Sequence, residues 1–157
     1  MPTLLAILLL TAFPSNTRTG WMRLESFRLA IGMPRAQAEQ VLEKWNPKAG
    51  KDSNELVVDY ADDKSMTLEF RKDRLTSVRF ELFEYLGTTR LAFDEEKQHL
   101  AEARGKPRKA TKNILIYDNA LPNVMVVVTD DPESAQGKKG LGVLAVRYYD
   151  PRPLPRD

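Results

Sequence analysis

Hydrophobic and polar positions in the first half of the chain predict one helix followed by three strands. The helix is expected to begin at Pro34, which suits the first helical position because its missing N–H would be unpaired there anyway. Gly32, just before it, can take a positive φ, and residues 46–50 end the helix with turn-forming residues. Its apolar positions recur at helical spacing: Ala38, Val41, Leu42 and Trp45.

Three segments with alternating apolar and polar residues follow this helix. Their inward sets are Leu56, Val58 and Tyr60, then Met66, Leu68 and Phe70, then Thr76, Val78, Phe80 and Leu82. The second and third sets meet in an antiparallel pair if Met66 faces Phe80, Leu68 faces Val78 and Phe70 faces Thr76. This register needs an odd-length loop, so we predict a loop of three or five residues around residues 72–74.

The second half repeats this order. Asp94 is a suitable N-cap for a second helix, Phe93, Leu100 and Ala103 supply its apolar positions, and Gly105 ends it. Apolar segments follow at 114–117, 124–128 and 141–149. The segment 124–128 is continuously apolar, which predicts a strand that is central in the sheet or covered on both faces.

The two predicted helices begin about 60 positions apart, which indicates an internal duplication. We therefore expect a single α+β domain, residues 27–149, built from tandem αβββ halves at 27–86 and 89–149. The halves would form one antiparallel sheet with the helices packed on one face. Residues 150–157 contain three prolines and are expected to be a tail.

The N-terminal residues indicate export. The apolar run from Thr3 to Phe13 has the length of a signal-peptide core and is shorter than the roughly 20 residues that a membrane span needs. No basic residue precedes it, and Ser15 and Thr17 are the nearest match to a small-x-small cleavage site. We expect a signal peptide at 1–17, a linker at 18–26, and an exported, periplasmic or secreted protein whose mature chain begins near residues 16–20. A buried N-terminal helix in a cytoplasmic protein is the alternative.

Composition narrows the function classes. The chain has 157 residues, a net charge of +2, and 24 basic against 22 acidic residues that are interleaved along the sequence. A nucleic-acid-binding protein usually gathers its positive charge on one face, so no nucleic-acid partner is expected. The absence of cysteine excludes disulfides, thiolate nucleophiles and Cys-ligated metals.

Short motifs in the first half resemble the SmpA/OmlA (BamE-like) domain. The matching residues are 31–35, with Val41 and Leu42, and the strand pair 65–70 and 75–78. Taken twice, the plan also resembles the β-lactamase-inhibitor-protein (BLIP-like) tandem fold. The resemblance implies a binding protein rather than an enzyme. Pro34 stands where that family has Ser or Thr, and no cysteine is present for the lipid anchor of its outer-membrane members.

Candidate catalytic and metal-binding groups each have a simpler interpretation. His99 has Glu95 and Glu102 as helical neighbours, an arrangement that could suit a metal pair or an acid–base dyad. A solvated helix face explains it better, because no second histidine and no cysteine supports a metal or catalytic site. The acidic stretches at 62–63 and 130–133 lack calcium-loop spacing. The glycine-containing stretch 137–142 precedes a strand rather than a helix, so it does not fit a phosphate-binding loop. We therefore expect no catalytic residue, cofactor or metal.

The expected function is that of a non-catalytic protein-binding module, envelope-associated or secreted and inhibitor-like. Aromatic and basic residues on strands and on the loop 130–140 are the predicted contacts with a partner: Tyr60, Tyr85, Tyr117, Tyr149, Lys138 and Lys139. The partner would be another protein, bound by a monomer with no stable membrane span. Core packing of the tyrosines, pairing of a partner strand at a sheet edge, and a small ligand carrier or enzyme of unknown chemistry remain the alternatives.

Overall fold

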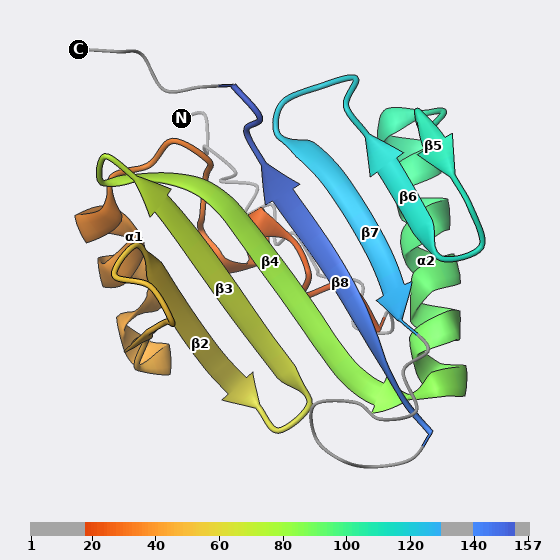
Figure 1. Cartoon of the computed structure of the whole chain (residues 1–157), viewed down its shortest axis with the longest axis horizontal. Coiled ribbons are helices and arrows are strands. Elements are labelled where there is room, and N and C mark those ends of the chain that lie inside the picture. Colours follow the sequence, from red (N-terminus) through yellow and green to blue (C-terminus); the bar gives the residue numbers. More distant parts are fainter. Residues whose placement is uncertain (1–17, 130–139, 153–157) are drawn as a thin grey trace, which may run out of the picture.

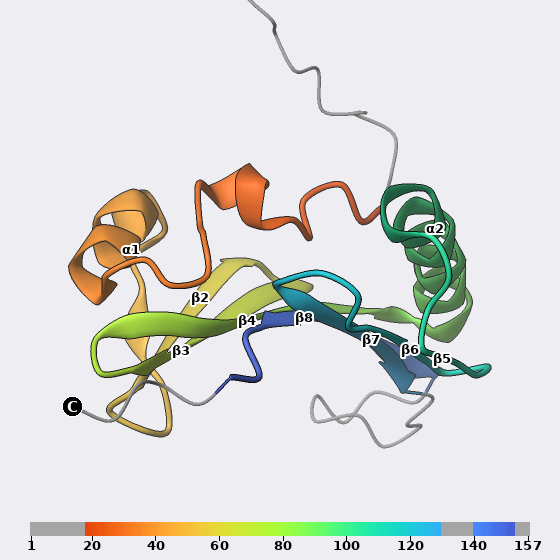
Figure 2. The same ribbon diagram turned by 90° about the horizontal axis from the view of Figure 1, so that it is seen from above.

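A computed structural model describes residues 18–129 and 140–152. In these ranges the protein is an antiparallel sheet with two α-helices on one of its faces (Figures 1 and 2). The helices are α1 (Arg35–Leu42) and α2 (Leu86–Arg104), with the 3-10 helices η1 (Leu24–Phe27) and η2 (Glu43–Trp45). The strands are β1 (Lys48–Ala49), β2 (Glu55–Ala61), β3 (Lys64–Arg71), β4 (Arg74–Tyr85), β5 (Lys109–Ala110), β6 (Ile114–Tyr117), β7 (Asn123–Thr129) and β8 (Leu141–Tyr149). The predicted α+β class is confirmed.

The eight strands lie in the order β1-β2-β3-β4-β8-β7-β6-β5. Each half of the chain therefore supplies one helix and then four neighbouring strands, and β4 and β8 meet at the centre of the sheet. Both edge strands are only two residues long, and both read Lys-Ala. Short edges that carry lysine disfavour pairing with a further strand. The duplication itself remains a prediction.

Alternate residues of the strands face the helices and form the core. Leu68, Val78 and Phe80 are fully buried there. The segment 18–33 crosses this same face between α1 and α2 (Figure 2). Trp21 packs edge-on against Phe80, with ring centroids 6.1 Å apart. Core residues therefore begin well before residue 27.

The prediction that residues 18–26 form a linker was wrong. Met22 is 0% exposed, Thr19 is 1% exposed, and Phe27 stacks on Phe80 at 5.6 Å. Frequent turn-forming residues in this stretch are typical of a linker. Its apolar side chains, however, cover the part of the sheet that lies between α1 and α2 and so complete the core. The segment belongs to the domain.

The predicted register of β3 and β4 was right at two of three pairs. Met66 pairs with Phe80 and Leu68 with Val78 as expected. Phe70 pairs with Leu75, so its expected pairing with Thr76 was wrong. The loop has two residues, Lys72 and Asp73, both at positive φ, instead of three or five. A β-bulge allows a two-residue turn while Leu68 and Val78 still face the same side of the sheet. Thr76 is the extra residue of the bulge, opposite Glu69 and Phe70.

The helix boundaries also differ from the prediction. Helix α2 begins at Leu86, so Asp94 lies within the helix and is not its N-cap. Helix α1 begins at Arg35, with Pro34 as the extended residue before it. The two helices thus start 51 rather than 60 positions apart, from Arg35 to Leu86. Gly32 and Gly105 have positive φ as predicted.

Candidate interaction surface

The tyrosines predicted to contact a partner are not brought together. Tyr117 is 1% exposed on the helix-covered face of β6, so its predicted role as a surface contact was wrong. Tyr60 is half-buried and packs against Trp21 on the same face. Tyr149 lies on the opposite face, and Tyr85 is 71% exposed at the end of β4. Lys138 and Lys139 lie outside the described residues.

The sheet face opposite the helices, here called the open face, carries no described helix (Figure 2). Over β6, β7, residues 141–145 of β8 and Phe83 of β4, the half-buried side chains on this face are apolar. Their pairing places Val127 between Ile114 and Ala145, Met125 beside Ile116, and Val143 beside Phe83. These side chains form what we call the apolar patch: Phe83, Ile114, Ile116, Met125, Val127, Val143 and Ala145.

The apolar patch corrects one of the two alternatives predicted for β7. The continuous apolar run 124–128 was expected to be central in the sheet or covered on both faces. Strand β7 does lie inside the sheet, between β8 and β6. Within the run, however, only Val124, Val126 and Val128 are buried, so the second alternative was wrong. Met125 and Val127 point to the open face and are half-buried. The signal for the patch was present in the sequence, since β6 and β8 also carry apolar residues at their outward positions.

Two arginines face each other beside the patch, at the centre of the open face. Arg79 of β4 pairs with Arg147 of β8. Each guanidinium has a carboxylate partner: Arg79 Nε lies 2.8 Å from Glu81, and Arg147 Nη2 lies 3.3 Å from Glu69. Like charges directly opposite in a sheet are unfavourable, and these carboxylates offset the repulsion. Both arginine side chains remain partly exposed, at 46% for Arg79 and 34% for Arg147.

Arg147 is held in place by two further contacts. Its Nε donates to Oγ of Ser77 at 2.8 Å, and its guanidinium lies 5.0 Å from the ring centroid of Tyr149. Such stacking on an aromatic ring orients the planar group. We call Arg79, Arg147 and their partners Glu69, Ser77, Glu81 and Tyr149 the arginine cluster. The predicted contact residue Tyr149 thus belongs to this cluster, at the edge of the apolar patch.

A hollow lies on the helix-covered side, between η1 and α2. Its volume is about 640 Å³, and its walls include Arg23, Glu95, His99 and Tyr148. Partial burial and then the charge of Arg23 lower the pKa of His99. Among residues 18–129 and 140–152, no group of three or more acidic or histidine side chains could hold a metal ion.

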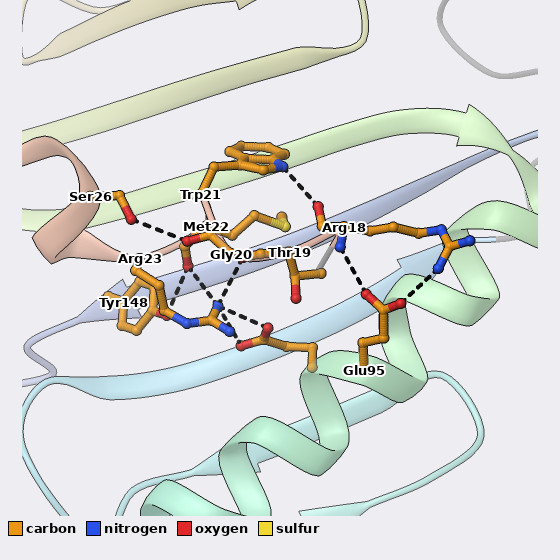
Figure 3. Close-up of polar contacts among 10 residues, drawn as sticks. Arg18, Thr19, Gly20, Trp21, Met22, Arg23, Ser26, Glu95 and Tyr148 are labelled. Carbon is orange, nitrogen blue, oxygen red and sulfur yellow. Dashed lines mark hydrogen bonds and ion pairs between the residues drawn. The ribbon is translucent and has the colours of Figure 1, made fainter. Parts of the chain in front are cut away.

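A buried ion pair lies beside this hollow and joins the segment before η1 to α2. Glu96 is 0% exposed, and Arg23 Nη1 lies 3.1 Å from its Oε1 and 2.9 Å from its Oε2. The same nitrogen donates to the carbonyl oxygens of Thr19 and Met22 (Figure 3). Burial raises the pKa of Glu96, and the positive charge of Arg23 opposes that rise.

A buried carboxylate with a raised pKa can mark a catalytic site, but two observations favour a structural role for Glu96. It is not among the residues lining the hollow, and its cation is bound at the same time to the backbone of the segment. Sequence reasoning did not single out Glu96. The available signal was its helical spacing with Ala92 and Leu100, which places a charged residue on the buried stripe of α2.

The Tyr148 hydroxyl makes a further contact with this segment, which gives a testable prediction. It donates to the carbonyl oxygen of Met22 at 2.9 Å in a buried setting. Tyr148→Phe leaves that carbonyl without this donor and should lower the free energy of unfolding by about 0.5–1.5 kcal/mol. Urea denaturation measures the difference. Tyr149→Phe on the open face should change it by less than about 0.5 kcal/mol, and an equal effect of the two variants would contradict the assignment of faces.

Comparison of the chain with protein-family models, with curated proteins and with solved structures found no match. The resemblance to the SmpA/OmlA and BLIP-like proteins therefore rests only on the short motifs and on the repeated order of predicted elements. The functional argument below depends on the geometry of the open face.

Proposed function

We propose that this protein is a non-catalytic module that binds another protein on the open face of its sheet. The observation that carries the proposal is the contiguous apolar patch over β6–β8. Single apolar residues on a protein surface are ordinary, but a continuous apolar group on a rigid sheet is characteristic of an interaction site. Transfer of this patch out of water would supply the driving force for binding.

The arginine cluster indicates the chemistry of the partner. A second copy packed face to face about the centre of the sheet would bring two copies of Arg79 and of Arg147 together, which is electrostatically unfavourable. A different protein, with apolar side chains beside a carboxylate, would match both parts of the face. The carboxylate would lie against the exposed sides of the two guanidinium groups.

The setting we propose is the envelope or the exterior of the cell, with an inhibitor-like role. The support for this is the apolar run Thr3–Phe13 and the polar residues after it. Within the described part of the chain, no helix is both long enough and apolar enough to cross a bilayer.

A small-ligand carrier is the competing proposal, and the hollow between η1 and α2 favours it. Its volume falls within the range of small-molecule sites. Arg23, however, is already bound to Glu96, and Arg104 donates to the carbonyl of Ala120. We favour the open face because its apolar patch supplies a driving force for binding, whereas two of the charged groups that would orient a ligand in the hollow already have partners within the fold.

Paired surface variants test the proposal. We expect Val127→Glu, in the middle of the apolar patch, to reduce capture of a specific partner from the envelope fraction of the native host at least tenfold, because a charge would be desolvated in the contact. Leu91→Glu is the matched control, since Leu91 is 53% exposed on α2, away from the open face. Quantitative mass spectrometry of the captured proteins measures both. Equal loss with both variants, or no loss with Val127→Glu, would contradict the proposal.

A further inference from the structure

One carboxylate holds both the backbone and the side chain of Arg18. The backbone nitrogen of Arg18 donates to Oε2 of Glu95 at 3.0 Å, and its Nη1 donates to Oε1 at 2.7 Å (Figure 3). Glu95 lies on α2, which packs on the sheet, so the acceptor has a fixed place in the fold. The nitrogen of residue 18 therefore lies where a positively charged donor would be well bound.

The residues just after Arg18 belong to the core. Thr19 is 1% exposed and Met22 is 0% exposed, and the Trp21 indole donates to the carbonyl of Arg18 at 2.8 Å. A protease needs an accessible segment, and loss of residues 19–22 would remove core side chains. A processed form with an intact fold must therefore keep Thr19 and the residues after it, so the cut lies before Thr19.

The sequence before Arg18 suits removal of a leader at this bond. Ser15 and Thr17 are small residues three and one positions before Arg18, and they follow the apolar run Thr3–Phe13. We propose that the chain is cut between Thr17 and Arg18, and that the new α-amino group of Arg18 forms an ion pair with Glu95. The inference rests on the export that forms part of the proposed function.

The chemistry converts a neutral donor into a charged one at the same atom. Water adds across the Thr17–Arg18 peptide bond with a leader peptidase as catalyst, so Thr17 leaves with the new carboxylate. The nitrogen of Arg18 becomes an ammonium group with three donors and a positive charge. The neutral N–H bond to Glu95 is thereby replaced by a charge-assisted one, which is the stronger type. Processing would strengthen the attachment of the N-terminal segment to α2.

Intact-mass measurement of the full chain, expressed in an exporting bacterial host, locates the cut. We expect the exported protein to have the mass of residues 18–157. A cut at any other bond, or exported protein with residues 1–17 still attached, would overturn the inference. The binding proposal is tested separately by the Val127→Glu and Leu91→Glu variants. Failure of the cleavage proposal can therefore be distinguished from failure of the binding proposal.

Charge variants on α2 test the new ion pair. Cell-free synthesis without membranes leaves the full chain uncut, and urea denaturation at low salt can compare it with the processed form. Glu95→Gln should lower the folding equilibrium constant of the processed form by an additional factor of about 2–5 relative to its effect on the uncut chain. Glu102→Gln removes a charge from the same helix and should act equally on both forms. An equal effect of Glu95→Gln on the two forms would overturn the ion pair.

Discussion

Arg23→Met is expected to lower the free energy of unfolding by about 3–5 kcal/mol, because it leaves Glu96 buried without its cation. Glu96 is 0% exposed and Arg23 is its ion-pair partner, with the side chain of Arg23 16% exposed. The substitution also removes the donor to the carbonyls of Thr19 and Met22. Urea denaturation at neutral pH measures the loss.

Two comparisons separate the buried charge from simple loss of packing. The double variant Arg23→Met/Glu96→Leu removes both charges and should be more stable than Arg23→Met alone. The cost of Arg23→Met should also fall as the pH is lowered toward 4.5, the usual pKa of a glutamic acid. Burial already raises the pKa of Glu96, and loss of Arg23 raises it further. At low pH the buried Glu96 is protonated and neutral, so the variant loses little stability. The loss of stability returns as the pH rises through the raised pKa. A cost independent of pH, with no rescue by the double variant, would contradict the role of the ion pair.

Leu68→Ala is expected to lower the free energy of unfolding by about 2–5 kcal/mol through loss of buried contacts and creation of a cavity. Leu68 is 0% exposed and pairs with Val78 on the helix-covered face of the sheet. A small domain has a total stability of about 5–15 kcal/mol, so the loss would be severe. Circular dichroism during urea denaturation gives the value.

The neighbouring open-face residues provide the controls. Glu69 and Arg79 form partly exposed ion pairs with Arg147 and Glu81. Their replacement by alanine should each change stability by about 0.5 kcal/mol or less. Damage by Glu69→Ala equal to that of Leu68→Ala would mean that the two faces of β3 are exchanged.

The parts of the fold that follow from local patterns were predictable. Alternation of apolar and polar residues placed Leu68 opposite Val78 because a half-buried strand has a period of two. The bulge at Thr76 was not predictable from that period, since it depends on combining a tight turn at Lys72 and Asp73 with the core contact of Leu75. Turn chemistry and burial had to be satisfied together.

In helix α2, the packing of buried side chains against the sheet overrides the low helix propensity of its first residues. The helix was predicted to begin at Asp94, although it extends back through Gly87, Thr88 and Thr89, which have low helix propensity. In the fold Thr89, Ala92 and Phe93 are buried on the side of α2 that faces the sheet. Because this packing stabilises the first turns, the helix begins at Leu86. Residues 18–26 follow the same logic, because their role in the core depends on space between two helices that the sequence alone does not reveal.

The candidate surface was predictable only in part. Tyrosine was taken as a marker of exposed contacts, but Tyr117 fills the core and Tyr60 packs among other rings. Residue type does not reveal which face of a sheet the helices cover. The apolar patch emerges when outward positions of strands distant in sequence, such as Ile116 and Val143, are assembled by the strand order.

Position-resolved photo-crosslinking tests the proposed binding face most directly. A photoreactive residue at position 127, in the apolar patch, should give one discrete adduct in the envelope of the native host. The crosslinked partner peptide should carry apolar residues beside Asp or Glu, and Arg79→Ala with Arg147→Ala should weaken the adduct. The same group at position 91, on α2, should give none. An adduct only from position 91, an adduct of two copies of this chain, or no adduct from position 127 would contradict the proposal that the open face binds another protein.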